Sequence, residues 1–89
     1  MARHLWATDR LWEAMVGGNE PAWRDGLEVL AETPLPFTPA GTDGLARRLQ
    51  DLAQDQLSRT TTLDERAAAY GELLRTCAGC HARMPPAAR

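Results

Sequence analysis

Apolar residues recur at intervals of three and four along four separate stretches of the chain. This spacing is typical of helices that bury one face. It predicts helices over residues 2–16, 20–32, 43–58 and 63–82. In the first of these helices the predicted apolar stripe consists of Leu5, Thr8, Leu11, Trp12 and Met15, with His4 on the same face.

Start and stop signals bound these stretches. Gly17-Gly18 ends the first helix, as glycine after a helix commonly does, and Asn19 is a good N-cap for the second. The segment 33–41 contains three prolines, which a helix interior does not tolerate, so we predict a loop there. Thr42 is the expected N-cap of the third helix.

The fourth helix has the clearest start. Thr62 is followed three residues later by Glu65, which is the pattern of a capping box. Gly26 lies inside the second helix, where it weakens the intrinsic helix propensity, and we expect it to allow close packing.

Composition favours an all-α fold. The chain contains 15 Ala and 12 Leu, against two Val and no Ile, and Ala and Leu are strong helix formers. Four amphipathic helices with short connections predict an antiparallel up-down-up-down four-helix bundle. A chain of 89 residues has room for a single domain, 1–89. In this topology the start of the first helix lies beside the end of the fourth.

Charge and hydropathy exclude two classes of partner. The formal net charge is −2 and the pI is about 5.6, so there is no basic face to attract nucleic acid. No run of 18 apolar residues occurs, so we expect no membrane span.

The chemistry-bearing motif is Cys77-Ala78-Gly79-Cys80-His81, the C-x-x-C-H signature of c-type haem attachment. Two thiols three residues apart lie on one helical turn and can add to the two vinyl groups of haem. The adjacent imidazole of His81 then ligates the iron. We therefore predict one haem c, attached covalently through Cys77 and Cys80 at one end of the bundle.

Other interpretations of the motif remain open. A C-x-x-C pair also serves as a redox dithiol, but that motif usually follows a strand, and no strand is evident here. The two cysteines and the two histidines, His4 and His81, could instead bind zinc. A chance occurrence is the remaining alternative.

The chain resembles cytochrome c′ and its low-spin four-helix-bundle relatives. The stretch from Tyr70 to His81 is similar to the final helix of that family, and the segment Glu13–Gly18 is similar to the end of its first helix. The resemblance implies a protein of the bacterial periplasm, its leader removed, with His81 as the proximal ligand. It implies single-electron transfer between redox partner proteins and no enzymatic activity. The alternative that it implies is binding of nitric oxide or carbon monoxide at an open distal site.

The distal ligand is expected to be His4. The predicted topology brings the start of the first helix to the end of the fourth, and an imidazole binds both oxidation states of iron. Met1, Met15 and Met84 are the other ligand candidates. Met15 lies roughly 16 Å along the helix from His4, at about 1.5 Å per residue, and is expected in the core.

Three further residues are candidates for packing against the haem. Tyr70 and Leu74 share a face of the fourth helix with Cys77 and His81, and Trp6 is close to His4. Whether two copies of the chain form a homodimer stays open.

Overall fold

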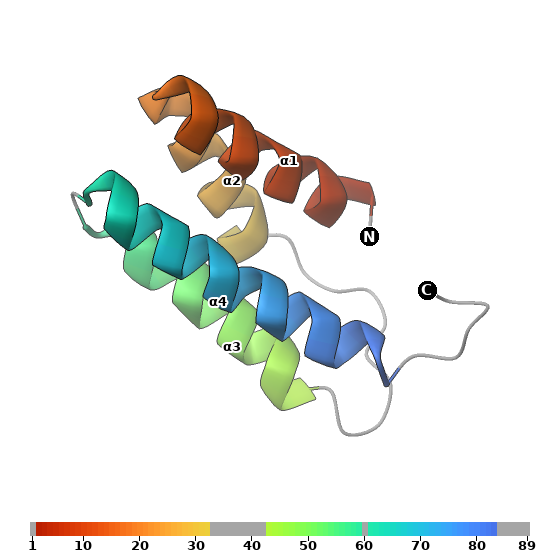
Figure 1. The fold of residues 1–89 in the computed structure, drawn as a ribbon. Coiled ribbons are helices and arrows are strands. Elements are labelled where there is room, and N and C mark those ends of the chain that lie inside the picture. Colours follow the sequence, from red (N-terminus) through yellow and green to blue (C-terminus); the bar gives the residue numbers. More distant parts are fainter. Residues whose placement is uncertain (1, 33–42, 60, 84–89) are drawn as a thin grey trace.

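The computed structural model describes residues 2–32, 43–59 and 61–83. Within these ranges it contains four helices and no strand: α1 (Ala2–Gly17), α2 (Glu20–Glu32), α3 (Asp43–Leu57) and α4 (Leu63–His81) (Figure 1). The all-α prediction is confirmed, and each predicted helix matches an observed one to within a residue at either end. None of the four helices is long and apolar enough to cross a membrane, as far as the chain is described.

The turn between α1 and α2 forms as its residues dictate. Gly18 has a φ of 64°, a left-handed conformation that glycine adopts without strain. The N–H of Asn19 donates to the Ala14 carbonyl at 3.0 Å, which closes the end of α1. The Asn19 side chain in turn accepts from the N–H of Ala22 at 3.1 Å, so it caps α2 as predicted.

The predicted capping box of α4 is also confirmed. The Thr62 hydroxyl accepts from the N–H of Glu65 at 3.2 Å, and the Glu65 carboxylate accepts from the N–H of Thr62 at 3.0 Å. These hydrogen bonds favour the ionised carboxylate, so the pKa of Glu65 lies below its usual value. The predicted loop over 33–41 and the predicted cap at Thr42 lie outside the described residues.

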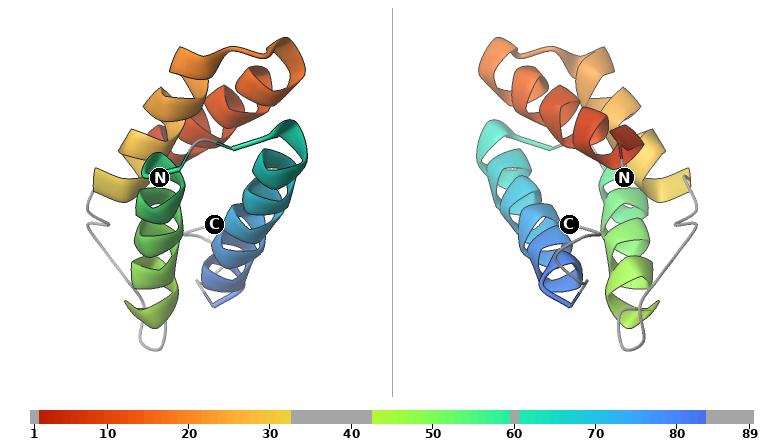
Figure 2. Two further views of the ribbon diagram at one scale, coloured as in Figure 1. Left: turned by 90° about the vertical axis from the view of Figure 1, so that its left-hand side faces the viewer. Right: turned by 90° about the vertical axis from the view of Figure 1, so that its right-hand side faces the viewer.

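The helices pack as a ring of neighbours, an arrangement compatible with a four-helix bundle. Helix α1 contacts α2, α2 contacts α3, α3 contacts α4, and α4 contacts α1. The contact between α1 and α4 is the smallest of the four. The end of α1 lies near the start of α4, and from there the two helices diverge toward the start of α1 and the end of α4 (Figures 1 and 2). The prediction that the start of the first helix lies beside the end of the fourth is therefore wrong.

A single apolar core joins all four helices. Its largest fully buried side chains are Trp23, Leu11, Leu27, Leu30 and Leu73. Small residues complete it where α1 meets α2: Ala7, Ala14, Ala22 and Gly26 are all buried. A Cβ built on Gly26 would lie 2.8 Å from the Ala7 carbonyl oxygen, so the expected close packing at Gly26 is confirmed.

The predicted apolar stripe of α1 is partly wrong. Leu5 is 66% exposed and Trp12 is 55% exposed, whereas Ala7 and Ala14, outside the predicted stripe, are buried. The reason is the close approach of α1 to α2 at Gly26, where small residues allow the alanine side of α1 to pack directly against α2. The larger Leu5 and Trp12 are left on the flank that faces α4.

Candidate functional site

The C-x-x-C-H motif occupies the last turns of α4. Cys80 is buried, with 7% of its surface exposed, while Cys77 and His81 are half-buried. Both thiols are free. A Cβ built on Gly79 would be 3.5 Å from the Leu45 side chain of α3, an ordinary packing distance. Gly79 therefore faces α3, and the two cysteines and His81 lie on other sides of the same turn.

The two sulfurs lie close to each other, as a separation of three residues in a helix requires. Burial raises the pKa of the Cys77 thiol, and the nearby Cys80 raises it further, since a second thiolate would repel the first. Two adjacent thiols on one helical turn can both attach covalently to a single ligand.

Helices α1 and α4 touch through an aromatic pair. The ring centroids of Trp12 and Tyr70 are 6.2 Å apart, with the planes inclined at 41°. Burial raises the pKa of the Tyr70 hydroxyl, and Asp9 and Cys77 add to this effect. Both the Asp9 carboxylate of α1 and the Cys77 thiol therefore act on the Tyr70 hydroxyl.

We call the surface where α1 faces α4 the α1–α4 seam, defined by Leu5, Trp12, Tyr70, Leu74 and Cys77. Leu5 precedes Trp12 by seven residues, or about two turns, and so lies on the same side of α1. Leu74 follows Tyr70 by four residues, which is about one turn. Cys77 lies four residues, again about one turn, before the end of α4. Leu5 and Leu74 are 66% and 40% exposed where the two helices diverge. The seam thus presents uncovered apolar side chains on both helices, and on α4 the exposed Leu74 lies less than one turn before Cys77.

His4 is buried, with only 6% of its surface exposed. It shares a face of α1 with Leu11, which is buried, and Met15, which is partly buried. The prediction that His4 lies on the inward side of α1 is confirmed. Iron ligation by His4 stays a prediction, and the alternative ligands Met1 and Met84 lie outside the described residues.

Trp6 lies away from the seam. It is exposed, and the guanidinium carbon of Arg10 is 5.8 Å from its ring centroid. It follows Leu5 directly, so it is turned by about 100° around α1 from the seam. Packing of Trp6 against a haem stays a prediction. The sequence analysis predicted that Leu5 and Trp12 belong to the core. Their separation of seven residues does place them on one side of α1, but that side is exposed.

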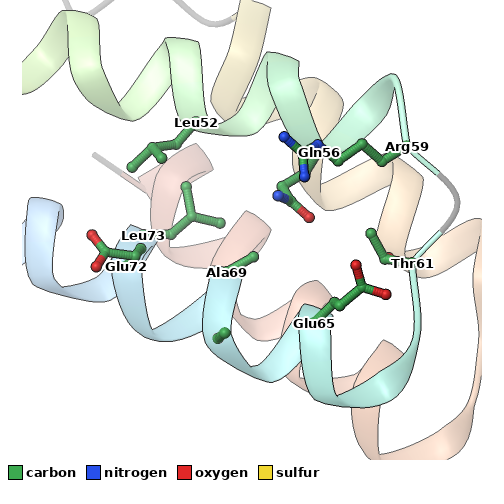
Figure 3. A pocket seen from close by; sticks show the side chains of 9 residues that line it. Leu52, Gln56, Arg59, Thr61, Glu65, Ala69, Glu72 and Leu73 are labelled. Carbon is green, nitrogen blue, oxygen red and sulfur yellow. The ribbon is translucent and has the colours of Figure 1, made fainter.

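A groove of about 260 Å³ lies between α3 and α4 (Figure 3). Its lining includes Leu52 and Leu73 and the polar residues Gln56, Arg59 and Glu65. None of the predicted site residues contributes to it. The groove belongs to the half of the bundle where α3 ends and α4 begins.

The end of α4 provides two thiols and one imidazole within five residues. In the described part of the chain, no three His, Cys, Asp or Glu side chains come together as a metal-binding group. A structural zinc site needs four protein ligands. A c-type haem takes from its attachment motif only two thiols and one imidazole, because the porphyrin supplies four ligands itself. Cys77, Cys80 and His81 meet that requirement within five residues.

Comparison with known proteins finds no match. No protein-family model matches the chain, and neither a curated protein nor a solved structure does. Function is therefore inferred from the residues of the chain itself.

Proposed function

We propose that the protein is a monohaem c-type cytochrome that carries single electrons between redox partner proteins in the periplasm. The observation that carries the proposal is the end of α4, where two thiols and an imidazole, Cys77, Cys80 and His81, closely follow the exposed apolar side chain of Leu74. Exposed apolar side chains gathered beside reactive groups typically mark a ligand or partner site. A covalently attached porphyrin supplies a flat apolar surface to cover them.

The proposal includes an antiparallel up-down-up-down bundle with the haem at one end. Contacts between helix ends support it. Arg24, near the start of α2, donates to the carbonyl of Leu57, the last residue of α3, at 3.4 Å. Gly79, near the end of α4, faces Leu45, near the start of α3. Both pairs join the beginning of one helix to the end of its neighbour.

Each site residue has a distinct role in this proposal. Cys77 and Cys80 fix the porphyrin through thioether bonds, and His81 is the proximal ligand. When bound, haem iron supplies the one-electron change between the ferric and ferrous states, and its axial ligands and surroundings set the potential. Leu5, Leu74 and Tyr70 exclude water from one side of the site. The protein contributes burial and ligand identity, with no catalytic step on a substrate.

His4 is the proposed distal ligand. It lies in the first turn of α1 and on its inward face. A pair of imidazole ligands keeps both oxidation states low-spin, so that little rearrangement accompanies electron transfer. Bis-His ligation also lowers the potential relative to His/Met ligation.

Expression with a c-type maturation system tests the proposal. The wild-type chain should yield a red protein with one haem per chain that survives acid-acetone extraction. The double variant Cys77→Ser, Cys80→Ser should lose covalent haem. Ala78→Ser is the matched control, because Ala78 is exposed and lies between the two cysteines, and it should load haem normally.

Two results would contradict the proposal: haem that is fully extracted by acid-acetone, or stoichiometric zinc in place of iron. If the haem is covalently bound but high-spin, the proposed attachment site is correct. The proposed function then changes from electron transfer to binding of nitric oxide or carbon monoxide at an open distal position.

A further inference from the structure

Trp12 and Tyr70 mark the point where α1 and α4 meet. They form the ring contact across the smallest helix interface of the described chain, with their centroids 6.2 Å apart. Trp12 is nearer the end of α1 than its start, and α1 and α4 diverge toward the start of α1 and the end of α4 (Figures 1 and 2). The pair therefore lies at the inner limit of the diverging part of the seam.

Exposed apolar residues lie on both sides of the Trp12–Tyr70 pair along α1 and α4. Val16 and Leu63 lie beyond it toward the end of α1 and the start of α4, while Leu5 and Leu74 lie toward the diverging end. All four are exposed, so none of them closes the seam by itself. Trp12 and Tyr70 are the aromatic side chains that join the two helices between these exposed residues.

Tyr70 is placed on the same stripe of α4 as the thiol that would hold the haem. Cys77 follows it by seven residues, which is two turns or about 10 Å along the helix. Burial raises the pKa of the Tyr70 hydroxyl, and Asp9 of α1 and Cys77 raise it further. A flat group attached at Cys77 and entering the seam would pass Leu74 and then reach Tyr70 and its partner Trp12.

We propose that Trp12 and Tyr70 are positioning residues that form the inner wall of the haem site and limit access of water to the iron. The inference rests on the proposed function, because it needs a haem attached at Cys77 and Cys80. Aromatic rings suit this role, since they pack well against flat apolar surfaces and each other. An apolar wall controls solvent access and local polarity, and these in turn set the redox potential.

Substitution of the two rings tests the wall. Trp12→Leu, Tyr70→Leu and the double variant remove the aromatic contact but keep apolar side chains, and Tyr70→Phe restores the ring without the hydroxyl. Val16→Ala and Leu63→Ala are matched controls, because they are exposed residues on the same two helices on the far side of the pair. The measurements are the reduction potential and the association rate of carbon monoxide with the ferrous protein.

The two leucine variants should each lower the potential and raise the carbon monoxide association rate several-fold, because water and ligand gain access. The double variant should change less than the sum of the single changes, as expected for residues that act through one contact. Tyr70→Phe and the two controls should behave like the wild type. Circular dichroism and covalent haem content should remain at the wild-type level in all variants.

Two outcomes overturn the inference, and they differ. If haem attaches but the leucine variants match the wild type in both measurements, the wall is wrong and the proposed function survives. If the wild type takes no covalent haem, both proposals fall together. If Trp12→Leu does not fold, the comparison of Tyr70→Leu with Tyr70→Phe tests the inference alone. Equal reduction potentials and equal carbon monoxide association rates in these two variants would contradict the proposed wall.

Discussion

The guanidinium carbon of Arg66, on α4, lies 5.1 Å from the centre of the Trp23 ring of α2. The same guanidinium forms an ion pair with Glu20, at the start of α2. Its Nε also donates to the Thr61 hydroxyl at 2.9 Å. The Arg66 side chain is only 12% exposed. One arginine thus joins two helices that are not neighbours in the ring.

Arg66→Ala should lower the free energy of unfolding by about 1–2 kcal/mol, since it removes a partly desolvated cation–π contact and an interhelical ion pair. Arg66→Lys should recover only part of the loss, because an ammonium group cannot reproduce the planar fork. Urea unfolding of the purified protein measures both. Arg59→Ala is the control: its pair with Asp55 is exposed and joins the last turn of α3 to a residue just after it, so the change should stay below about 0.5 kcal/mol. Equal losses for Arg66 and Arg59 would contradict the role of Arg66.

Gly26→Ala should destabilise the protein by about 1–3 kcal/mol, the usual range for overpacking. Its Cβ would lie 2.8 Å from the Ala7 carbonyl oxygen and 2.9 Å from a methyl group of Leu11. Gly71→Ala, inside α4, is the matched control, since a Cβ there meets nothing within 4 Å. That variant should gain up to about 1 kcal/mol from helix propensity alone. Thermal unfolding of the two variants should therefore move in opposite directions, and a shared direction would show that α1 and α2 are not in close contact at Gly26.

Acid should weaken the start of α4. The folded state lowers the pKa of Glu65, so its contribution to stability is present above the unfolded pKa and is lost as the pH falls through the lowered folded value. Glu65→Gln should make unfolding less sensitive to pH in the acid range, because glutamine does not titrate. Thr62→Ala should cost about 1 kcal/mol at pH 7 through loss of the cap.

Denaturant unfolding between pH 3 and pH 7 checks this prediction, and Asp64→Asn is the control in the same helical turn. If Glu65→Gln and Asp64→Asn keep the same pH dependence as the wild type, Glu65 does not contribute to the acid response.

His4→Ala in the haem-loaded protein should convert a low-spin spectrum into a high-spin one and raise the reduction potential, because it removes one of two imidazole ligands. Absorption spectroscopy and redox titration measure these changes. Met15→Leu is the control, since Met15 shares the inward face of α1 with His4. A spectrum that changes in Met15→Leu but not in His4→Ala would transfer the distal role to Met15.

Local residues determined the helices and their ends. The φ of Gly18, the cap at Asn19 and the reciprocal hydrogen bonds of Thr62 and Glu65 involve residues within five positions of each other. Such signals act before any tertiary contact forms, so they can be recognised in the sequence alone. The C-x-x-C-H motif is equally local, since its side chains lie within less than two turns of one helix.

The tertiary structure decided which side of each helix is buried and where the uncovered side chains gather. Helical spacing alone predicted that Leu5 and Trp12 are buried. Because the small residues Ala7 and Gly26 allow α1 and α2 to lie very close together, a narrower face of α1 is buried in the core, and Leu5 and Trp12 stay exposed. Arg66 pairs with Glu20, which lies 46 residues away in the sequence, and no local pattern indicates this pairing. Periodicity specifies the orientation of side chains about one axis only. How closely two axes approach, and how far α1 diverges from α4, depends on side-chain volumes from different helices acting together.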